Sequence, residues 1–434
     1  MHPRDALPIV PLTAPIDAVV VLPGSKSITN RALVCAALAE GDSELRGALR
    51  ADDTDAMLDG LGALGVAIEP DWDRPAIRVH GCAGRPPADV AIVDARMSGT
   101  TARFLLPVAA LGVGTRRVDG AHRLRERPMG PSLEALRSLG ADVRIIGSPT
   151  HLPVELRGGS LRGGSIELPG DTSSQFLSGL LLSAPAMPAG LTIRLTTELV
   201  SRPYVDMTVA VMAAFGVDVD HPDPSTWRVA PGPYRGAAYD IEPDASAASY
   251  TFAAAVIAGG RVQVDGLGTS SLQGDLAFVE LLREMGAEVE QTAEHTTVRS
   301  GGTLHGIEAD LSQISDTAQT LAVVAAFADG PTRVTGIGFI REKETDRIGA
   351  VVTELRRAGI DASEESDGFV VRPGPLRPAV IQTYDDHRMA MAFALLGLRT
   401  PGIEIADPEC VGKTFPGYWS MLDGLRRPGR VLPS

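Results

Sequence analysis

The sequence predicts an α/β protein with two domains, each built from three copies of an α/β unit. The 434 residues are enough for two or three domains of about 150 residues each. Five amphipathic helices each end at a glycine, and successive glycines are 75, 76, 70 and 73 residues apart. A second series of six helices, apolar on nearly all sides, runs in step with the first.

Each helix of the first series is followed by a short apolar strand. The glycine at its end fits a C′ residue in the left-handed conformation. These segments occupy residues 57–69, 133–145, 211–220, 281–290 and 355–363, with glycines at Gly65, Gly140, Gly216, Gly286 and Gly359. A sixth amphipathic helix is predicted over residues 418–426.

The second series consists of small apolar residues, which is typical of buried helices. Its members occupy residues 31–41, 102–112, 174–184, 248–260, 318–330 and 387–397. The repeat is longer than the roughly 20–50 residues of solenoid repeats, so we expect six α/β units in two compact domains. The expected domains are residues 23–241, and residues 1–22 together with 242–434.

The composition excludes several classes of protein. The net charge of −14 is opposite to that of a nucleic-acid-binding surface. No apolar run approaches the roughly 20 residues of a membrane span, and the N-terminal residues lack the apolar core of a signal peptide. Three cysteines without a CxxC pair argue against a disulfide framework or a structural zinc site. We expect a cytoplasmic protein that binds neither nucleic acid nor membrane.

Side chains suited to anion binding stand at the starts of four apolar helices. N-capping alone explains the small hydroxyl and carboxylate residues of each flank. Capping does not require the additional Lys26 and Arg31, Arg103, Gln175, or His387 and Arg388. Because helix N-termini attract phosphate and carboxylate groups, several such ends together predict a site for anionic substrates.

Lysine is rare, and its positions are informative. Only Lys26, Lys343 and Lys413 stand among the 40 basic residues. All three lie in flank or loop motifs, namely PGSKSITNR, REKETDR and CVGKTFPGY. In a chain that otherwise prefers arginine, these positions indicate a need for a compact ammonium group rather than a planar guanidinium.

Two cationic stretches also have a purely structural interpretation. The segment HRLRERP places Arg123, Arg125 and Arg127 on one face if it is extended, and such a run is often a solvated edge. Lys343 and Arg347 are four residues apart, as in a salt-bridge lattice on a helix surface.

Nine motifs together resemble the 5-enolpyruvylshikimate-3-phosphate synthase family. In chain order from Pro23 to Pro416 they are PGSKSITNR, SGTTAR, ERP, TSSQF, LVSRPY, SDTAQ, KETDR, DDHRMA and KTFP. The resemblance implies a two-domain inside-out α/β barrel of six βαβαββ repeats, three per domain. It also implies transfer of the enolpyruvyl group of phosphoenolpyruvate to the 5-hydroxyl of shikimate 3-phosphate, with release of phosphate. That reaction belongs to the shikimate pathway, which leads to chorismate and the aromatic amino acids.

The resemblance assigns the substrate-binding residues. Those expected to bind shikimate 3-phosphate are Lys26, Ser27, Arg31, Ser173, Ser174, Gln175, Ser201, Asp316 and Lys343. Those expected to bind phosphoenolpyruvate are Lys26, Gly99, Arg127, Gln175, Arg347, Arg388 and Lys413. Arginine forks match carboxylate and phosphate geometry, and a glycine lets the backbone approach a ligand closely.

The resemblance implies Asp316, Glu344 and Lys26 as catalytic residues. Asp316 is expected to accept the proton of the 5-hydroxyl, and Glu344 to protonate C3 of phosphoenolpyruvate and later remove a proton there. Lys26, Arg127 and Lys413 would stabilise charge at the tetrahedral centre. No metal or organic cofactor is implied, the partners are the two small-molecule substrates, and the family is commonly monomeric.

Three residues depart from the family pattern. Met97 stands where many members have asparagine, Phe104 stands where smaller residues are found, and Phe339 replaces a side chain that often contacts shikimate 3-phosphate. Met97 and Phe104 flank the SGTTAR turn and are expected to alter the sensitivity to glyphosate, which competes with phosphoenolpyruvate in this family.

Three other functions compete with this interpretation. UDP-N-acetylglucosamine enolpyruvyl transferase shares the fold and the phosphoenolpyruvate chemistry, but that family generally uses a loop cysteine, and residues 112–128 contain none. A binding protein derived from a decayed enzyme would not require the intact Asp316 and Glu344. A structural scaffold would leave the positions of the three lysines unexplained.

Overall fold

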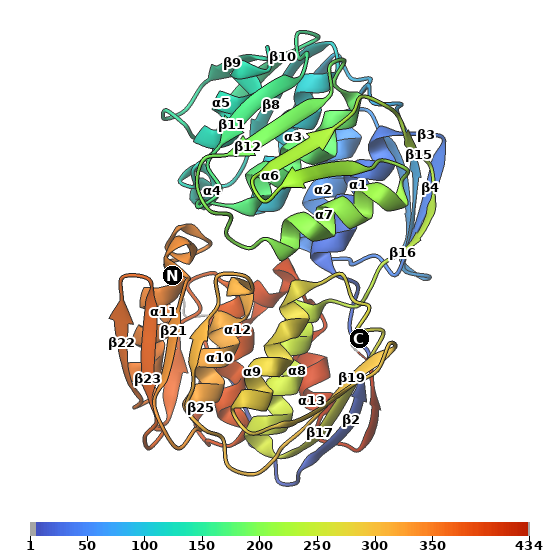
Figure 1. The fold of residues 1–434 in the computed structure, drawn as a ribbon. Helices are drawn as coiled ribbons and strands as arrows, with labels where there is room; N and C mark the ends of the chain where they lie inside the picture. The colour runs from blue at the N-terminus through green and yellow to red at the C-terminus, as the bar shows by residue number, and fades with distance from the viewer. Residues whose placement is uncertain (1–5, 433–434) are drawn as a thin grey trace. The chain divides into compact units, whose positions relative to one another are not determined.

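The structure is a computed structural model that describes residues 6–432. The chain forms two compact units. One, the terminal unit, comprises the described residues up to Pro23 and those from Pro243 onward; the other, the inserted unit, comprises Gly24–Glu242. In Figure 1 the inserted unit runs from blue to green, and most of the terminal unit is yellow to red.

Three apolar helices form the interior of the inserted unit. They are α1 (Lys26–Leu38), α3 (Gly99–Leu111) and α6 (Ser174–Ser183). Three further helices are partly exposed, namely α2 (Asp52–Ala63), α5 (Gly130–Ser138) and α7 (Pro203–Ala214), and a short helix, α4, spans His122–Arg125.

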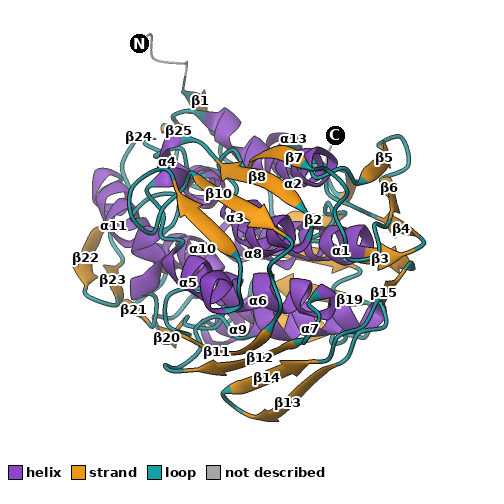
Figure 2. Ribbon diagram, turned by 90° about the horizontal axis from the view of Figure 1, so that it is seen from above, coloured by secondary structure: helices purple, strands orange, loops and turns teal. Residues whose placement is uncertain are grey.

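Three four-stranded sheets lie outside these helices (Figures 1 and 2). Their orders are β16-β4-β6-β5, β7-β8-β10-β9 and β11-β12-β14-β13. The strands of the first sheet are β4 (Asp42–Arg46), β5 (Ala67–Asp71), β6 (Ala76–His80) and β16 (Ala238–Asp240). Those of the second are β7 (Val90–Asp94), β8 (Gly114–Asp119), β9 (Asp142–Ile145) and β10 (Val154–Gly158). Those of the third are β11 (Gly164–Leu168), β12 (Leu191–Leu195), β13 (Val219–Asp223) and β14 (Thr226–Val229). A short pair joins β3 (Ala39–Glu40) to β15 (Tyr234–Arg235).

The terminal unit repeats this plan. Its interior helices are α8 (Ala245–Ala258), α10 (Ala318–Ala325) and α12 (His387–Ala394), and its other α-helices are α9 (Phe278–Glu284), α11 (Arg347–Arg357) and α13 (Tyr418–Gly424). Its sheet orders are β18-β19-β17-β2-β26, β20-β21-β23-β22 and β1-β25-β24.

The strands of the terminal unit include the start of the chain. The first sheet contains β2 (Ile16–Val20), β17 (Gly260–Asp265), β18 (Glu288–Gln291), β19 (His295–Arg299) and β26 (Gly429–Val431). The second contains β20 (Glu308–Asp310), β21 (Thr332–Thr335), β22 (Asp361–Glu365) and β23 (Gly368–Arg372). The third contains β1 (Leu7–Pro8), β24 (Ala379–Ile381) and β25 (Ile403–Ile405).

One pairing pattern recurs in five of these sheets. A parallel pair of strands is extended by two antiparallel strands, as in β7, β8, β10 and β9. The parallel pair needs a crossover connection, and in this example the crossover contains the apolar helix α3 between β7 and β8. The sheet faces that cover the buried helices carry alternating apolar residues, such as Ala91 and Val93 of β7.

The predicted helix ends are confirmed. The five glycines at the ends of the amphipathic helices all have positive φ values, from 81° to 103°. Side chains also cap the starts of five interior helices, by way of Ser25, Ser98, Ser173, Asp244 and Asp386.

Two local expectations are wrong. The segment HRLRERP is not extended, because residues His122–Arg125 form α4, so its three arginines do not share a strand face. Lys343 and Arg347 do not lie on one helix, because a 3-10 turn ends at Glu342 and α11 begins at Arg347 with Asp346 as its N-cap.

Candidate active site

In the inserted unit, the predicted residues of α1 lie at its N-terminal end. The Nζ atom of Lys26 is 3.4 Å from Oδ2 of Asp53, whose side chain is almost fully buried. Arg31 is also buried and donates hydrogen bonds to the Ser27 carbonyl at 2.9 Å and to Thr208 Oγ1 at 2.7 Å. Burial lowers the pKa of Arg31 to about 10. The arginine therefore supports the turn that carries Ser27.

The starts of α3 and α6 are joined by Arg103 and Gln175. Arg103 donates to the side-chain Oε1 of Gln175 at 2.7 Å, and the side-chain Nε2 of Gln175 donates to Thr100 Oγ1 at 3.1 Å. This contact crosses from one buried helix to the next and holds the two N-terminal ends together. Arg103 is absent from the set of residues assigned from the sequence, although its position at a helix start singled it out.

Gly99 makes room for Arg127. A Cβ atom at Gly99, the first residue of α3, would lie 2.8 Å from the guanidinium of Arg127, which is 5% exposed. Only a residue without a side chain lets this cation lie against the start of the helix. The same end of α6 bears Ser173 and Ser174, both buried or nearly so, and the Ser173 hydroxyl accepts from the Gln175 N–H.

Ser201 lies just before α7 in a left-handed conformation, with φ of +53°. Its side chain is buried. A non-glycine residue in this region is uncommon and is held there by its surroundings.

In the terminal unit, five of the predicted residues form one chain of ion pairs. The Lys413 ammonium lies 2.8 Å from Glu344, and the other oxygen of Glu344 lies 2.9 Å from the Arg347 guanidinium. Arg347 in turn contacts Asp316 at 3.2 Å, and Asp316 contacts Arg388 at 2.6 Å. The two predicted catalytic carboxylates are therefore held by the same guanidinium.

Asp386 completes this ion cluster. It is fully buried, caps α12 by accepting from the Arg388 N–H, and accepts from Arg347 Nε at 2.8 Å. Burial lowers the pKa of Arg347, but the attraction of Asp386, Glu344 and Asp316 outweighs it, so the net pKa is raised above its ordinary value. Arg347 remains a permanent cation in the cluster.

Asp386 and Asp53 were not assigned from the sequence. A carboxylate that orients a basic residue is indistinguishable in sequence from an N-cap or a surface acid, because its partner lies many residues away. Lys343, in contrast, was assigned; it is partly exposed, and its Nζ atom lies 5.9 Å from the centre of the Phe339 ring.

His387 is a buried titratable group beside this cluster. Its side chain is 1% exposed, and neither ring nitrogen has a hydrogen-bond partner. Burial, followed by the charges of Lys413 and Arg388, lowers the pKa of His387 well below its ordinary value. The imidazole is therefore neutral in the folded protein.

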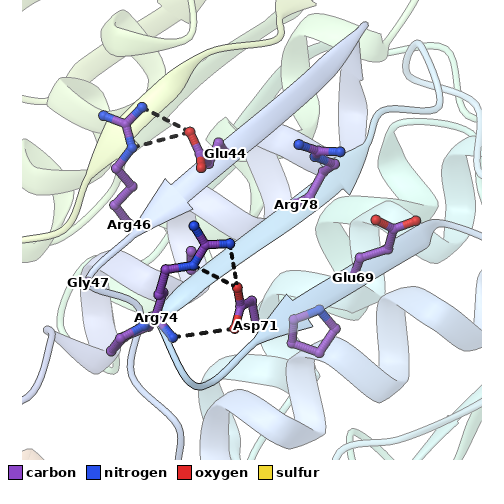
Figure 3. A pocket seen from close by; sticks show the side chains of 10 residues that line it. Glu44, Arg46, Gly47, Glu69, Asp71, Arg74 and Arg78 are labelled. Carbon is purple, nitrogen blue, oxygen red and sulfur yellow. Dashed lines mark hydrogen bonds and ion pairs between the residues drawn. The ribbon is translucent and has the colours of Figure 1, made fainter.

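A surface hollow of about 600 Å³ lies over the sheet that contains β4, β5 and β6, and none of the predicted residues lines it. Figure 3 shows Arg46 turned to Glu44 and Arg74 turned to Asp71. Arg78 stands opposite Glu44 and Glu69 in the strand registers. With three arginines facing three carboxylates, the hollow is electrically balanced and exposes no net charge to an anion.

Within residues 6–432, no group of three histidine, cysteine, aspartate or glutamate side chains is placed to hold a metal ion. No helix in that part of the chain is both long and apolar enough to cross a membrane.

Both units thus place arginine and lysine side chains, mostly buried, at the starts of apolar helices. Such ends combine free N–H groups, the positive end of the helix dipole and charge-assisted donors. The fold is that of a two-unit α/β protein, and the chemistry of these helix ends suits small molecules that carry phosphate and carboxylate groups.

Comparison with known proteins identifies the family. The model for EPSP synthase (3-phosphoshikimate 1-carboxyvinyltransferase) matches residues 11–422. The protein of that name from Nostoc sp. (strain PCC 7120) is 45% identical over 417 residues, which cover 96% of this chain and 98% of the relative. The relative from Methanoculleus marisnigri is 44% identical, with 95% and 97% covered. The chain belongs to the EPSP synthase family.

Solved structures agree with this assignment. The EPSP synthase of Acinetobacter baumannii superposes with a TM-score of 0.79 at 27% identity, with 96% of each chain covered. The enolpyruvyl transferase NikO from Streptomyces tendae, at 20% identity and with 94% of each chain covered, shares the fold with a TM-score of 0.76. The expected family resemblance, two-domain α/β fold class and transferase class are confirmed. The number of repeats stays a prediction.

Proposed function

We propose that the protein transfers the enolpyruvyl group of phosphoenolpyruvate to the 5-hydroxyl of shikimate 3-phosphate. The products are 5-enolpyruvylshikimate 3-phosphate and inorganic phosphate. Family membership over nearly the whole chain supports the reaction. The single structural observation that carries it is the pair of carboxylates, Asp316 and Glu344, bound to one buried guanidinium and flanked by Arg388 and Lys413.

The inserted unit is proposed to bind anionic groups of both substrates. Ser173 and Ser174 would offer hydroxyl and N–H donors to the phosphate of shikimate 3-phosphate at the start of α6. Gln175, held by Arg103, would orient a substrate oxygen. Further proposed contacts to shikimate 3-phosphate come from Ser27, Arg31, Ser201 and, in the terminal unit, Asp316 and Lys343.

Phosphoenolpyruvate is proposed to compete with the acids for the cations of the ion cluster. Its carboxylate and phosphate would draw Arg388, Arg347 and Lys413 away from part of their pairing with Asp316 and Glu344. Glu344 would then lose the positive neighbours that stabilise its ionised form and could hold a proton for transfer. Lys26, Gly99, Arg127 and Gln175 are the proposed contacts to phosphoenolpyruvate in the inserted unit.

The proposed reaction runs by addition and elimination. The 5-hydroxyl oxygen of shikimate 3-phosphate attacks C2 of phosphoenolpyruvate as its proton passes to Asp316, and C3 takes a proton from Glu344. The tetrahedral centre then loses phosphate as the bond between C2 and the phosphate oxygen breaks, and the departing phosphate takes up the proton held by Asp316. Glu344 removes a proton from C3 to form the new double bond. General acid–base help of this kind is worth about 10²–10⁴-fold.

The proposed reaction requires no metal or organic cofactor. We further infer a monomeric cytoplasmic enzyme whose partners are its small-molecule substrates. Three cysteines without a CxxC pair fit a reducing compartment, and the net charge of −14 disfavours a nucleic-acid partner. The monomeric state is inferred from the family alone, in which it is common.

Met97 and Phe104 are proposed to modify glyphosate inhibition. Phe104 is fully buried, and its ring lies 5.2 Å from the Arg31 guanidinium, so its influence would pass through the packing of α1 and α3. Inhibition constants measured for wild type and for Met97→Asn and Phe104→Pro would test this. Equal constants for all three proteins would contradict the proposal.

Phosphate release from phosphoenolpyruvate tests the function. Purified protein is supplied with either shikimate 3-phosphate or UDP-N-acetylglucosamine as the acceptor. Release is expected only with shikimate 3-phosphate, and it should fall by at least about 10²-fold in Asp316→Ala and Glu344→Gln. Release only with the sugar nucleotide would overturn the proposed acceptor. Binding of phosphoenolpyruvate without release would indicate a binding protein.

A further inference from the structure

The turn that precedes α12 has an unusual backbone. Tyr384 and Asp385 are consecutive non-glycine residues with φ values of +56° and +58°. A non-glycine residue in this left-handed region is strained and persists only where its surroundings hold it there. Asp386 follows directly and is the N-cap of α12. The backbone of this turn therefore determines the position of Asp386, the carboxylate at the centre of the ion cluster.

Glu354 is placed to hold this turn. It lies on α11, is fully buried, and accepts from the Gln382 N–H at 2.9 Å and from the Tyr384 hydroxyl at 2.6 Å. Arg357 donates to it at 2.8 Å and neutralises its charge. A carboxylate buried to this degree is costly without such partners. Neither the sequence motifs nor the proposed mechanism gives Glu354 a role.

The Tyr384 hydroxyl remains a donor throughout the neutral range. Burial and the hydrogen bond to Glu354 raise the pKa of Tyr384 to about 12. The bond between the two side chains is thus charge-assisted and directional.

Two residues of α11 form hydrogen bonds to the turn and to the N-cap that follows it. Arg347, its first residue, binds Asp386 through Nε at 2.8 Å and Nη2 at 3.3 Å, and Glu354 stands two helical turns further along. Asp386 also accepts from the Arg388 N–H. Moving the turn would therefore displace Asp386 and, with it, both arginines that contact Asp316.

We propose that Glu354 is a positioning residue, which holds the Tyr384–Asp385 turn in its left-handed conformation and thereby orients Arg347 and Arg388 toward phosphoenolpyruvate. This inference rests on the proposed function, because it assigns the two arginines to that substrate. Glu354 itself touches no reacting atom.

The test compares Tyr384→Phe and Glu354→Gln with the control Tyr418→Phe. Tyr418 is a matched control because its hydroxyl also serves the same helix, donating to the Met391 carbonyl of α12 at 2.6 Å. Tyr384→Phe and Glu354→Gln are each expected to raise the KM for phosphoenolpyruvate about tenfold and to change the KM for shikimate 3-phosphate less than twofold. Tyr418→Phe is expected to lower Tm by at least as much as Tyr384→Phe does, but to leave the KM values for both substrates unchanged. Equal KM values for wild type and Tyr384→Phe would overturn the proposal.

A second substitution tests the mechanism of positioning. Glycine adopts a φ near +58° without strain, so adding Asp385→Gly to Tyr384→Phe should lower the raised KM for phosphoenolpyruvate at least threefold. No recovery would overturn the role of backbone strain and leave Glu354 as a stabilising residue only.

Direct titration with phosphoenolpyruvate separates this inference from the proposed function. The Kd of each variant is measured by calorimetry without shikimate 3-phosphate, because the proposed reaction would consume phosphoenolpyruvate if both substrates were present. If wild type binds phosphoenolpyruvate but releases no phosphate, the proposed function fails, and the Kd values still decide the role of Glu354. A tenfold weaker Kd in Tyr384→Phe supports the positioning role, and an unchanged Kd contradicts it.

Discussion

Arg116 is a buried cation that serves the fold and no substrate. Its guanidinium is fully buried on β8 and donates to the carbonyl oxygens of Pro86, Ala88, Ala109 and Val113 at 2.8–3.0 Å. One side chain thus ties the end of α3 to the loop before β7. A planar fork can satisfy carbonyls in several directions, whereas an ammonium has three donors at one point.

Arg116→Lys is therefore expected to lower the free energy of unfolding by about 2–4 kcal/mol, because buried carbonyls lose their donors. Urea denaturation measures the change. Arg117→Lys is the control, since the side chain of Arg117 is 40% exposed and forms an ion pair with Asp119. That substitution should stay within about 0.5 kcal/mol of wild type. Equal losses for the two variants would contradict the role of Arg116.

His387 makes stability depend on pH. Its pKa is well below 6.5 in the folded protein, chiefly through burial, whereas an unfolded histidine titrates near 6.5. As the pH falls through 6.5, the unfolded state takes up a proton that the folded state does not, so stability falls. Between pH 6.5 and 5.5, wild type should lose about 1 kcal/mol more than His387→Gln. The free energy of unfolding is measured by urea denaturation at each pH. Comparing its change with pH between the two proteins removes any difference in their stability at pH 6.5.

A His387→Gln variant with the same slope as wild type would show that the imidazole can be protonated inside the protein.

At the residue scale, the sequence predicted which side chains to examine but not how they pair. Lys26, Asp316, Glu344 and Lys413 stand in recognisable motifs. The contact from Arg103 to Gln175 joins residues 72 apart, and that from Arg347 to Asp386 joins residues 39 apart. Such pairs depend on the packing of separate helices, which one sequence does not specify.

At the scale of elements, α3 and α6 meet without a side chain between them. A Cβ atom at Gly179 of α6 would lie 2.5 Å from the Arg103 carbonyl of α3. Pro107, four residues later in α3, has no N–H group to donate to that carbonyl. The glycine and the proline together let the two backbones approach closely near the Arg103–Gln175 contact.

Gly179→Ala should therefore cost about 1–3 kcal/mol of stability through overpacking, although alanine favours helices by about 1 kcal/mol over glycine. Thermal unfolding monitored by circular dichroism measures the change. Gly62→Ala is a matched control, because Gly62 lies on α2 and its Cβ would meet no atom within 4 Å. It should leave stability unchanged or raise it. Stabilisation in both variants would refute a tight contact between α3 and α6.

The elements themselves were largely predictable. Helix ends at Gly65, Gly140, Gly216, Gly286 and Gly359 follow from the need for a residue that tolerates positive φ. The short helix α4 and the break before Arg347 were not predicted, because tertiary contacts decide the conformation of short polar segments. The pairing order of the sheets also depends on contacts that no local pattern encodes.

At the scale of the whole molecule, one unit interrupts the other in sequence. The terminal unit needs the start of the chain, because β2 lies between β17 and β26 in its five-stranded sheet. Within that unit, the Asp244 N–H donates to the Pro23 carbonyl at 2.9 Å. Within the inserted unit, the Ser25 N–H donates to the Glu242 carbonyl at 2.8 Å. Pro23 and Asp244 are therefore neighbours within the terminal unit, and Ser25 and Glu242 are neighbours within the inserted unit.

Residues 24–242 are expected to fold alone with a cooperative thermal transition. Residues 243–434 alone should not do so, because they lack β2, whereas a chain in which a short glycine linker joins residue 23 to residue 243 should fold. Differential scanning calorimetry of the three proteins tests this. Cooperative folding of residues 243–434 alone would contradict the structural importance of β2.

The scarcity of lysine has a practical consequence for chemical labelling. Lys413 is paired with Glu344, Lys26 lies beside Asp53, and Lys343 lies over the Phe339 ring, so every side-chain amine of the chain belongs to the proposed substrate-binding set. On most proteins an amine-selective reagent reacts mainly with surface lysines. Here the extent of labelling at each lysine, read by mass spectrometry with and without phosphoenolpyruvate, would report occupancy of the site directly, without an activity assay.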